Sequence, residues 1–325
     1  MSIQRHVEWI QVAGKWTKMS IMGRNLSPDN LKIPNRKDED DRIVILMIPG
    51  NPGNEAFYSH FGREMLKNLE QKDEDETHKN QYLFYTVSSI NHVKMPDHLN
   101  GTYGHFSSDR FSLEDQVAHK LEFVREHLPR GKEVYIFGHS IGSYMMLRIL
   151  PNVVHEGFNV KKAVALFPTI QHMAASPNGQ RLQSVLSTLN THDWFTKCAS
   201  FWVDYLPICV KRWLVSLNLR HPSTPDEIHD ASVEILHKDV FRNIVHMSND
   251  ELDFIVDLDH KLIENRDLVH FYYGKKDGWC PVEHGYSMLE LLGGDQVTID
   301  EDDCEHAFVI SEGDIMARNV VNYFE

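Results

Sequence analysis

Residues 133–142, EVYIFGHSIG, decide the fold of this chain. The apolar run at 134–137 is typical of a strand that is buried on both faces, as in a parallel sheet. The strand leads directly into Gly-x-Ser-x-Gly, and no helix breaker follows before Pro151. The stretch therefore predicts a strand, a tight turn that carries Ser140, and a helix.

This context favours Ser140 as a nucleophile. A strained strand-to-helix turn lifts a serine hydroxyl group clear of the sheet, and side chains at Gly138 and Gly142 would collide with the neighbouring backbone. The start of the following helix offers backbone N–H groups to a developing oxyanion. The five-residue pattern also occurs by chance, so the interpretation depends on the strand before it and the helix after it.

The composition limits the classes of function. A chain of 325 residues with 42% hydrophobic residues is long enough for one large α/β domain. A net charge of −14 argues against nucleic acid as a partner and against whole-surface attraction to anionic lipid. The four cysteines lack metal-type spacing, which favours a reducing compartment. Neither a secretory signal nor an apolar run of 18 residues is visible.

A second stretch predicts the oxyanion site. Residues 6–22 predict an edge hairpin, residues 28–41 a polar loop, and residues 43–48 a wholly apolar strand. That strand ends at PGNPG, residues 49–53, and in an α/β-hydrolase this loop supplies half of the oxyanion hole. Because Pro52 has no N–H group, we expect the two donors to be the N–H groups of Asn51 and Ile141. A plain turn is the alternative.

The rest of the chain alternates between helical and strand patterns. We expect helices at 56–69, at 113–128 after the N-cap Ser112, and at 307–324, and strands at 82–87, 163–167, 268–273 and 297–299. Residues 70–79 and 92–110 predict loops. Between 169 and 266 strand signals vanish, and capping boxes at 224–227 and 248–251 introduce helical patterns.

These patterns predict an α/β-hydrolase fold. Strands that alternate with helices imply a mostly parallel, doubly covered sheet. About a hundred helical residues between two strands are too many for a plain connection and imply an inserted helical cap. We expect a core of residues 1–168 and 267–325 and a cap of residues 169–266.

A serine nucleophile needs a base, and the base needs an orienting acid. In this fold the order along the chain is serine, acid, histidine. Asp277 follows the strand at 268–273 and is the predicted acid, although an aspartate before glycine is also common in turns. His306 follows the last strand and is the predicted base. Asp302 is the fallback acid, and His139 is interpreted as structural.

Residues 194–218 form an apolar segment within the predicted cap. They contain 16 hydrophobic residues out of 25, including Trp194, Trp202 and Trp213, and carry a net charge of +2. Pro207 predicts two short helices or one kinked helix. The segment either packs on the core and lines an acyl pocket, or lies in a lipid surface with its tryptophans at headgroup depth. Both can hold at once.

The chain resembles the lipid droplet-associated serine hydrolases, a family of the α/β-hydrolase superfamily. The resemblance rests on IPGNPG at 48–53, FY at 57–58, GHSIG at 138–142, LFPT at 166–169, GKKDGW at 274–279 and EHAF at 305–308. It implies Ser140, Asp277 and His306 as the catalytic triad. It also implies residence on lipid droplets and the cytosolic face of the endoplasmic reticulum, weak esterase activity toward cholesteryl esters, and a role in neutral-lipid storage.

Three hypotheses about function follow. The first is a serine carboxylester hydrolase that acts on hydrophobic lipid esters, of the cholesteryl ester class, at a droplet surface. The second is a droplet-bound regulator of lipid storage with little turnover. The third is a thioesterase or acyltransferase with the same triad. None of them calls for a cofactor or a metal ion, and the sequence identifies no protein partner.

Overall fold

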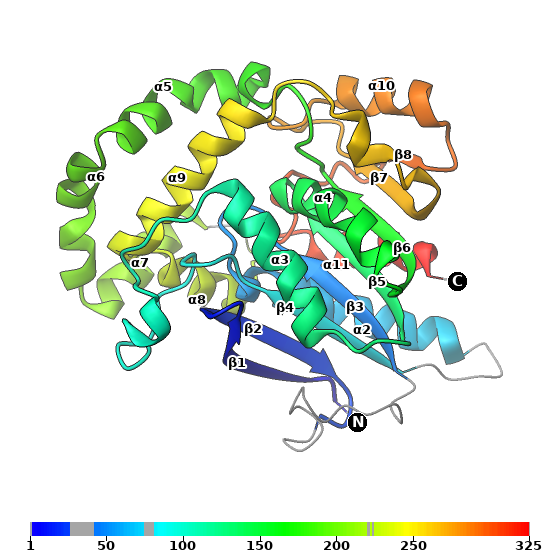
Figure 1. The fold of residues 1–325 in the computed structure, drawn as a ribbon, viewed down its shortest axis with the longest axis horizontal. Coiled ribbons are helices and arrows are strands. Elements are labelled where there is room, and N and C mark those ends of the chain that lie inside the picture. The colour runs from blue at the N-terminus through cyan, green and yellow to red at the C-terminus, as the bar shows by residue number, and fades with distance from the viewer. Residues whose placement is uncertain (1, 27–41, 75–80, 220–221, 223, 325) are drawn as a thin grey trace.

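The computed structural model describes residues 2–26, 42–74, 81–219, 222 and 224–324 (Figure 1). The strands are β1 (Gln4–Val12), β2 (Lys15–Gly23), β3 (Ile43–Ile48), β4 (Tyr82–Val87), β5 (Glu133–His139), β6 (Asn159–Leu166), β7 (Val269–Tyr273) and β8 (Val297–Ile299). The α-helices are α2 (Ser59–Glu74), α3 (Leu113–His127), α4 (Ile141–His155), α5 (Pro177–Thr191), α6 (Asp193–Ser200), α7 (Ile208–Asn218), α8 (Asp226–Glu234), α9 (Lys238–Phe254), α10 (Val282–Leu292) and α11 (Gly313–Val320).

All eight of these strands form one sheet, in the order β1-β2-β4-β3-β5-β6-β7-β8. The pairs β1–β2 and β2–β4 are antiparallel, and the pairs from β4 through β3 to β8 are parallel. The parallel strands therefore end at the same edge of the sheet, which is where α/β proteins place their ligands.

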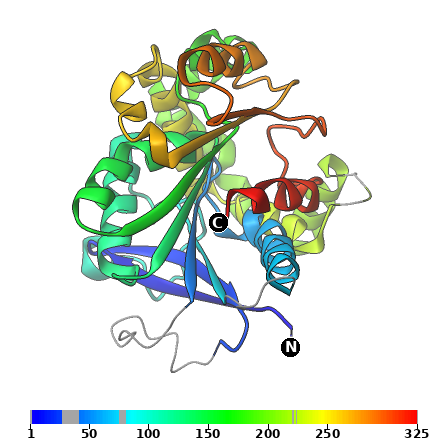
Figure 2. The same cartoon turned by 90° about the vertical axis from the view of Figure 1, so that its right-hand side faces the viewer.

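Helices cover both faces of the sheet. Helices α3 and α4 pack together on one face, and α2 and α11 pack together on the other (Figure 2). Strands β3, β4 and β7 are buried at every position, whereas β1 at the edge is mostly half-exposed. This burial explains why β3 is wholly apolar and why β4 and β7 are mostly apolar, whereas the edge hairpin alternates loosely. The α/β-hydrolase fold expected from the sequence is confirmed.

Several predicted elements match the structure closely. The edge hairpin is β1–β2, and the strands expected at 43–48, 82–87 and 297–299 have those bounds. Ser112 caps α3 through a capping box with Asp115, as expected. Pro207 separates α7 from a short 3-10 helix (Phe201–Tyr205) that follows α6. The predicted loop at 28–41 and residues 75–79 of the next one lie outside the described residues.

Other boundaries were predicted wrongly. Helix α2 continues to Glu74 instead of ending at residue 69, and α4 continues through Pro151 to His155. The final helix begins at Gly313, not near residue 307, because residues 306–311 form turns.

Neither predicted capping box in the cap forms. Helix α8 has Pro225 at its N-cap without a side-chain cap, and residues 248–251 lie inside α9. Sequence patterns locate buried strands better than helix ends, because helix ends depend on contacts with distant parts of the chain.

The described residues between β6 and β7 are mostly helical and include no strand. In Figure 1, α5 and α6 form an arc at the margin of the molecule, and α9 runs between this arc and the sheet. The division into a core of 1–168 and 267–325 and a cap of 169–266 stays a prediction. Among the described residues, none of the helices combines the length and the apolar character needed to cross a lipid bilayer.

Candidate active site

The turn between β5 and α4 holds Ser140 in a strained conformation. Its φ of 55° and ψ of −125° lie outside the regions that non-glycine residues usually adopt. A Cβ atom on Gly138 would lie 2.6 Å from the carbonyl oxygen of Gly142. A Cβ atom on Gly142 would overlap the carbonyl oxygens of Ile48 and Pro49. Glycine at both positions lets the helix pass this close to the neighbouring strand.

Three predicted site residues form one hydrogen-bonded chain. His306 Nε2 lies 2.9 Å from Ser140 Oγ, and His306 Nδ1 lies 2.5 Å from Asp277 Oδ2. These residues follow β5, β7 and β8, so the parallel sheet brings together positions that are 137 and 29 residues apart in sequence. The fallback acid Asp302 instead accepts a hydrogen bond from Asn319.

The Asp277 carboxylate has a complete set of donors. Its Oδ1 accepts hydrogen bonds from the backbone N–H groups of Trp279, at 2.7 Å, and Cys280, at 3.0 Å. Burial alone would raise the pKa of Asp277, but the hydrogen bond and the positive charge of His306 more than offset burial, so the pKa lies below its usual value. Asp277 therefore stays ionised and holds His306 in one tautomer.

Cys280 completes this group, and its thiol lies 3.0 Å from Asp277 Oδ2. Ligand atoms of Asp277, Cys280 and His306 all lie within 4.8 Å of one another, which is close enough for a shared metal ion. Burial, followed by the nearby Asp277 charge, raises the pKa of the Cys280 thiol well above its usual value. A protonated thiol donates a hydrogen bond, so Cys280 helps to orient the Asp277 carboxylate toward His306.

The loop after β3 approaches the serine closely. A Cβ atom on Gly50 would lie 3.1 Å from Ser140 Cβ. The N–H group of Gly50 donates to Tyr58, and that of Gly53 donates to His92. Within the described part of the chain, the N–H groups of Asn51 and Ile141 donate to no protein acceptor. Both N–H groups are therefore without a protein acceptor, and their role as oxyanion donors stays a prediction.

A pair of side chains links this loop to His306, and the sequence did not reveal it. The N–H group of Gly50 donates to Tyr58 Oη, at 2.9 Å, and Tyr58 Oη lies 2.7 Å from His139 Nδ1. His139 Nε2 lies 2.7 Å from the carbonyl oxygen of His306, so Nε2 carries the proton and Nδ1 accepts from Tyr58. Burial, and then the charge of His306, lower the pKa of His139 to about 3, which keeps this ring neutral.

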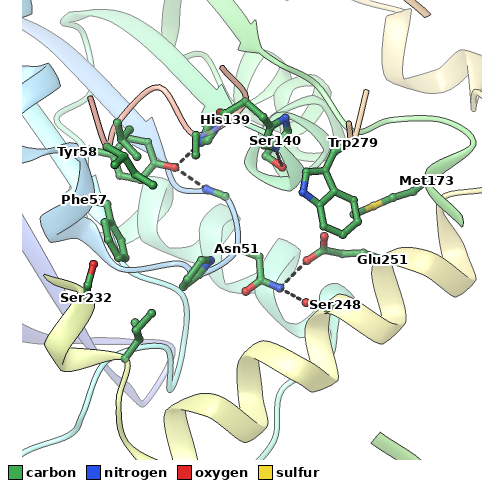
Figure 3. A pocket seen from close by; sticks show the side chains of 17 residues that line it. Asn51, Phe57, Tyr58, His139, Ser140, Met173, Ser232, Ser248, Glu251 and Trp279 are labelled. Atoms are coloured by element: carbon green, nitrogen blue, oxygen red, sulfur yellow. Dashed lines mark hydrogen bonds between the residues drawn. The ribbon is translucent and has the colours of Figure 1, made fainter. Parts of the chain in front are cut away.

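A pocket of about 330 Å³ opens beside Ser140 and His306. Most of its wall is apolar and comes from Phe57, Met173, Ile235, Trp279, Val309 and Ile310. Glu251 of α9 also lines the pocket, and Figure 3 shows it next to Asn51 and Ser248. The pocket can therefore accommodate an apolar group in front of the serine. The sequence gave no local signal for Glu251, which falls in the wrongly predicted capping box.

The three tryptophans of the apolar segment lie away from this pocket. Trp194, Trp202 and Trp213 are 67%, 50% and 59% exposed, and none of them lines the pocket. Large apolar side chains next to them are also exposed: Phe195, Phe201, Tyr205 and Ile208. The expectation that these aromatic residues line an acyl pocket is therefore wrong for the pocket at Ser140.

Comparison with known proteins identifies the family. The model of the lipid-droplet associated hydrolase family matches residues 41–309. The chain belongs to this family. The lipid droplet-associated hydrolase of Gallus gallus is 30% identical over 327 residues, which cover 98% of this chain and 94% of the relative. That of Homo sapiens is 29% identical over 293 residues, which cover 86% and 84%. The family expected from the sequence motifs is confirmed.

Solved structures similar to this lipid-droplet associated hydrolase family member share its fold. The 2-hydroxy-6-oxo-6-phenylhexa-2,4-dienoate hydrolase of a Rhodococcus strain superposes with a TM-score of 0.60 at 13% identity, covering 99% of each chain. A serine hydrolase of Cycloclasticus zankles superposes with a TM-score of 0.58 at 14% identity, covering 99% of this chain and 98% of its own. At such identities the similarity concerns the fold.

Proposed function

We propose that the protein is a serine hydrolase that cleaves carboxylic esters of lipids at the surface of lipid droplets. The observation that carries the proposal is the hydrogen-bonded chain from Ser140 through His306 to Asp277, which opens into an apolar pocket. Membership of the family supports the droplet surface as its location, because its relatives are named lipid droplet-associated hydrolases. Residence at the endoplasmic reticulum stays a prediction.

In the first half of the proposed reaction, Ser140 Oγ attacks the ester carbonyl carbon while His306 Nε2 takes the hydroxyl proton. The carbonyl oxygen becomes an oxyanion and accepts hydrogen bonds from the N–H groups of Asn51 and Ile141. Asp277 stabilises the imidazolium that forms. The bond between the carbonyl carbon and the alkoxy oxygen then breaks, and His306 gives its proton to the departing alcohol.

In the second half, water releases the acyl group from Ser140. His306 takes a proton from the water as its oxygen bonds to the acyl carbon, and a second oxyanion forms in the same site. The bond to Ser140 Oγ breaks, Oγ recovers the proton from His306, and the free acid leaves. Atoms balance overall: one ester and one water become one acid and one alcohol.

The pocket suggests how an apolar substrate binds. Its volume of about 330 Å³ lies near the lower end of the range for small-molecule sites. A cholesteryl ester, which is the substrate class we propose, would therefore place one arm in the pocket and leave the other outside. The exposed apolar segment that includes Trp194 and Trp213 would lie in the lipid surface, with the exposed Lys197 and Arg212 facing the headgroups, whereas Lys211 donates a hydrogen bond to the carbonyl oxygen of Leu236.

The purified protein and its Ser140→Ala variant, assayed on cholesteryl, glyceryl and short-chain esters, test the proposal. We expect hydrolysis of at least one lipid ester by the wild type and a loss of about 10⁴-fold or more in the variant. The exposed Ser287 of α10, changed to alanine, is a matched control outside the proposed triad. Hydrolysis by Ser140→Ala at the wild-type rate, or none of any ester by the wild type, would contradict the proposal.

A further inference from the structure

Helix α9 holds the side chain of Asn51. The Asn51 Nδ2 atom donates hydrogen bonds to Ser248 Oγ at 2.8 Å, to Glu251 Oε1 at 2.9 Å and to the carbonyl oxygen of Ile244 at 3.2 Å. Figure 3 shows the Asn51 amide pointing from its loop toward Ser248 and Glu251 on the helix. These partners lie about 200 residues away in sequence, so the contact ties two distant parts of the chain together.

The contact is buried at its Glu251 end, whereas Asn51 and Ser248 are half-buried and line the pocket. Glu251 is only 3% exposed, and burial raises its pKa to about 8 even though the hydrogen bond from Asn51 lowers it; the neighbouring Asp250 raises it further. At neutral pH Glu251 is therefore an uncharged acid that accepts the Asn51 hydrogen bond through Oε1. A buried acceptor is strong because water does not compete for the donor.

The same loop is held from its other side by the core. Tyr58 Oη accepts a hydrogen bond from the N–H group of Gly50, which is next to Asn51. The same hydroxyl group donates a hydrogen bond to His139 Nδ1. The loop is therefore held by hydrogen bonds from Tyr58 on one side and from Ser248 and Glu251 on the other. Its position relative to Ser140 depends on both, because the Asn51 N–H group has no protein acceptor of its own among the described residues.

We propose that Ser248 and Glu251 are positioning residues that hold the Asn51 loop so that the Asn51 N–H group points at the oxygen of the substrate. The proposal rests on the proposed function, because it concerns the stabilisation of the oxyanion that forms during ester cleavage. Neither residue acts on the reacting atoms; each acts through the Asn51 side chain. Displacing an oxyanion donor by a fraction of an ångström weakens transition-state binding more than substrate binding.

Steady-state kinetics of four variants on a water-soluble short-chain ester test the proposal: Glu251→Ala, Ser248→Ala, Asn51→Ala and Glu251→Gln. We expect Glu251→Ala to lower kcat about 10- to 100-fold with little change in KM. We expect Ser248→Ala to lower kcat less, because Glu251 still holds the amide. Glu251→Gln keeps an uncharged acceptor at Oε1 and should restore kcat to within about threefold of the wild type.

A double-mutant cycle separates positioning from direct contact with substrate. Asn51→Ala keeps the backbone N–H group but removes the amide that α9 holds. If Glu251 acts through Asn51, adding Glu251→Ala to Asn51→Ala causes little further loss of kcat. If the kcat losses of the two single variants multiply in the double variant, or if Glu251→Ala changes only KM, the proposal is overturned. Asp253→Ala, an exposed carboxylate on the same helix, is the control for changes in α9 itself.

Two results distinguish failure of the positioning proposal from failure of the proposed function. If wild-type Ser140 does not react with a fluorophosphonate, the proposed function fails, and the positioning proposal fails with it. If the wild type reacts and hydrolyses ester but Glu251→Ala and Ser248→Ala keep the wild-type kcat, only the positioning proposal fails. Thermal unfolding of each variant checks its fold; if Glu251→Ala does not fold, Ser248→Ala, which removes one hydroxyl group, carries the test.

Discussion

His139 contacts two parts of the site at once, although its side chain takes no part in the proposed proton transfer. Its Nδ1 atom accepts a hydrogen bond from Tyr58, whose hydroxyl group also accepts one from the Gly50 N–H group. Its Nε2 atom donates a hydrogen bond to the carbonyl oxygen of His306. The Asn51 loop and His306 are thus held by one hydrogen-bonded bridge. The interpretation of His139 as a structural residue agrees with these contacts, whereas Tyr58 gave no signal beyond its place in a family motif.

Removing the Tyr58 hydroxyl group should weaken catalysis more than binding. In Tyr58→Phe the Gly50 N–H group and His139 Nδ1 lose their partner, and we expect a stability loss of about 1–3 kcal/mol. We also expect kcat to fall about tenfold with little change in KM, because the loop and the base lose their link. Tyr286→Phe, at an exposed position on α10, is the control. Unchanged kcat in Tyr58→Phe would contradict the role of this bridge.

The raised pKa of Glu251 predicts a pH-dependent stability difference. An ordinary glutamate loses its proton near pH 4.5, whereas folded Glu251 does so only near pH 8. The unfolded chain therefore binds fewer protons between these values, and the wild type loses stability as pH rises through this range. Glu251→Gln has no proton to lose, so its melting temperature should rise relative to the wild type from about pH 5 to pH 8 and then level off.

Differential scanning calorimetry of both proteins between pH 5 and pH 9 measures this difference. The exposed Glu264, changed to glutamine, is the control for removing a carboxylate. Melting curves of the wild type and Glu251→Gln that keep a constant separation across this range would show that Glu251 is not buried as a neutral acid.

At the scale of elements, α9 contacts both the apolar segment and the Asn51 loop. Toward its N-terminus, Arg242 forms an ion pair with Asp193, the first residue of α6, at 2.7 and 2.9 Å. Toward its C-terminus, Ser248 and Glu251 hold Asn51. Glu251 is nine positions after Arg242 along the helix, a rise of about 14 Å. At the start of α9, the N–H group of Lys238 donates to Asp204 of the apolar segment at 2.8 Å. One continuous helix therefore contacts both the segment proposed to meet lipid and the loop proposed to bind the oxyanion.

Changing the exposed tryptophans should affect lipid binding more than catalysis. We expect Trp194→Ala combined with Trp213→Ala to reduce binding to a phospholipid-coated triolein emulsion several-fold, because each indole removes apolar area from water at the surface. Hydrolysis of a water-soluble short-chain ester should change little, since neither residue lines the pocket.

Flotation of the emulsion with bound protein measures this effect. The matched control is Tyr286→Ala combined with Leu291→Ala, which removes two exposed apolar side chains from α10. Equal losses of binding in both pairs would show that binding depends on apolar surface in general and not on the segment at 194–218.

Across the whole molecule, the sequence predicts the sheet better than the helices around the site. Strands such as β3 and β5 are buried on both faces, so their apolar runs mark them regardless of their neighbours. The order serine, acid, histidine follows from the fold, which explains how Asp277 and His306 could be named before their contacts were known. The Asn51–Glu251 contact joins residues 200 positions apart, and no local pattern encodes such a contact.

Charge is distributed unevenly over the molecule. The chain carries a net charge of −14, whereas residues 194–218 carry +2, and the basic side chains of Lys197 and Arg212 are 50% and 63% exposed although each pairs with an aspartate, Asp193 and Asp230. A basic apolar patch favours one orientation toward a lipid surface, because the remaining surface is repelled by anionic headgroups. This asymmetry places the segment toward lipid in the proposed arrangement.

The most direct test of the central claim is intact-protein mass spectrometry after treatment with a fluorophosphonate, with the site located by peptide mapping. If Ser140 is activated by His306 and Asp277, the wild type gains one phosphonyl adduct, located on Ser140. Ser140→Ala and His306→Ala gain none in the same time, while Asp302→Ala, which alters the carboxylate outside the triad, reacts as the wild type does. An unmodified wild type, or an adduct that persists in Ser140→Ala, would contradict the account.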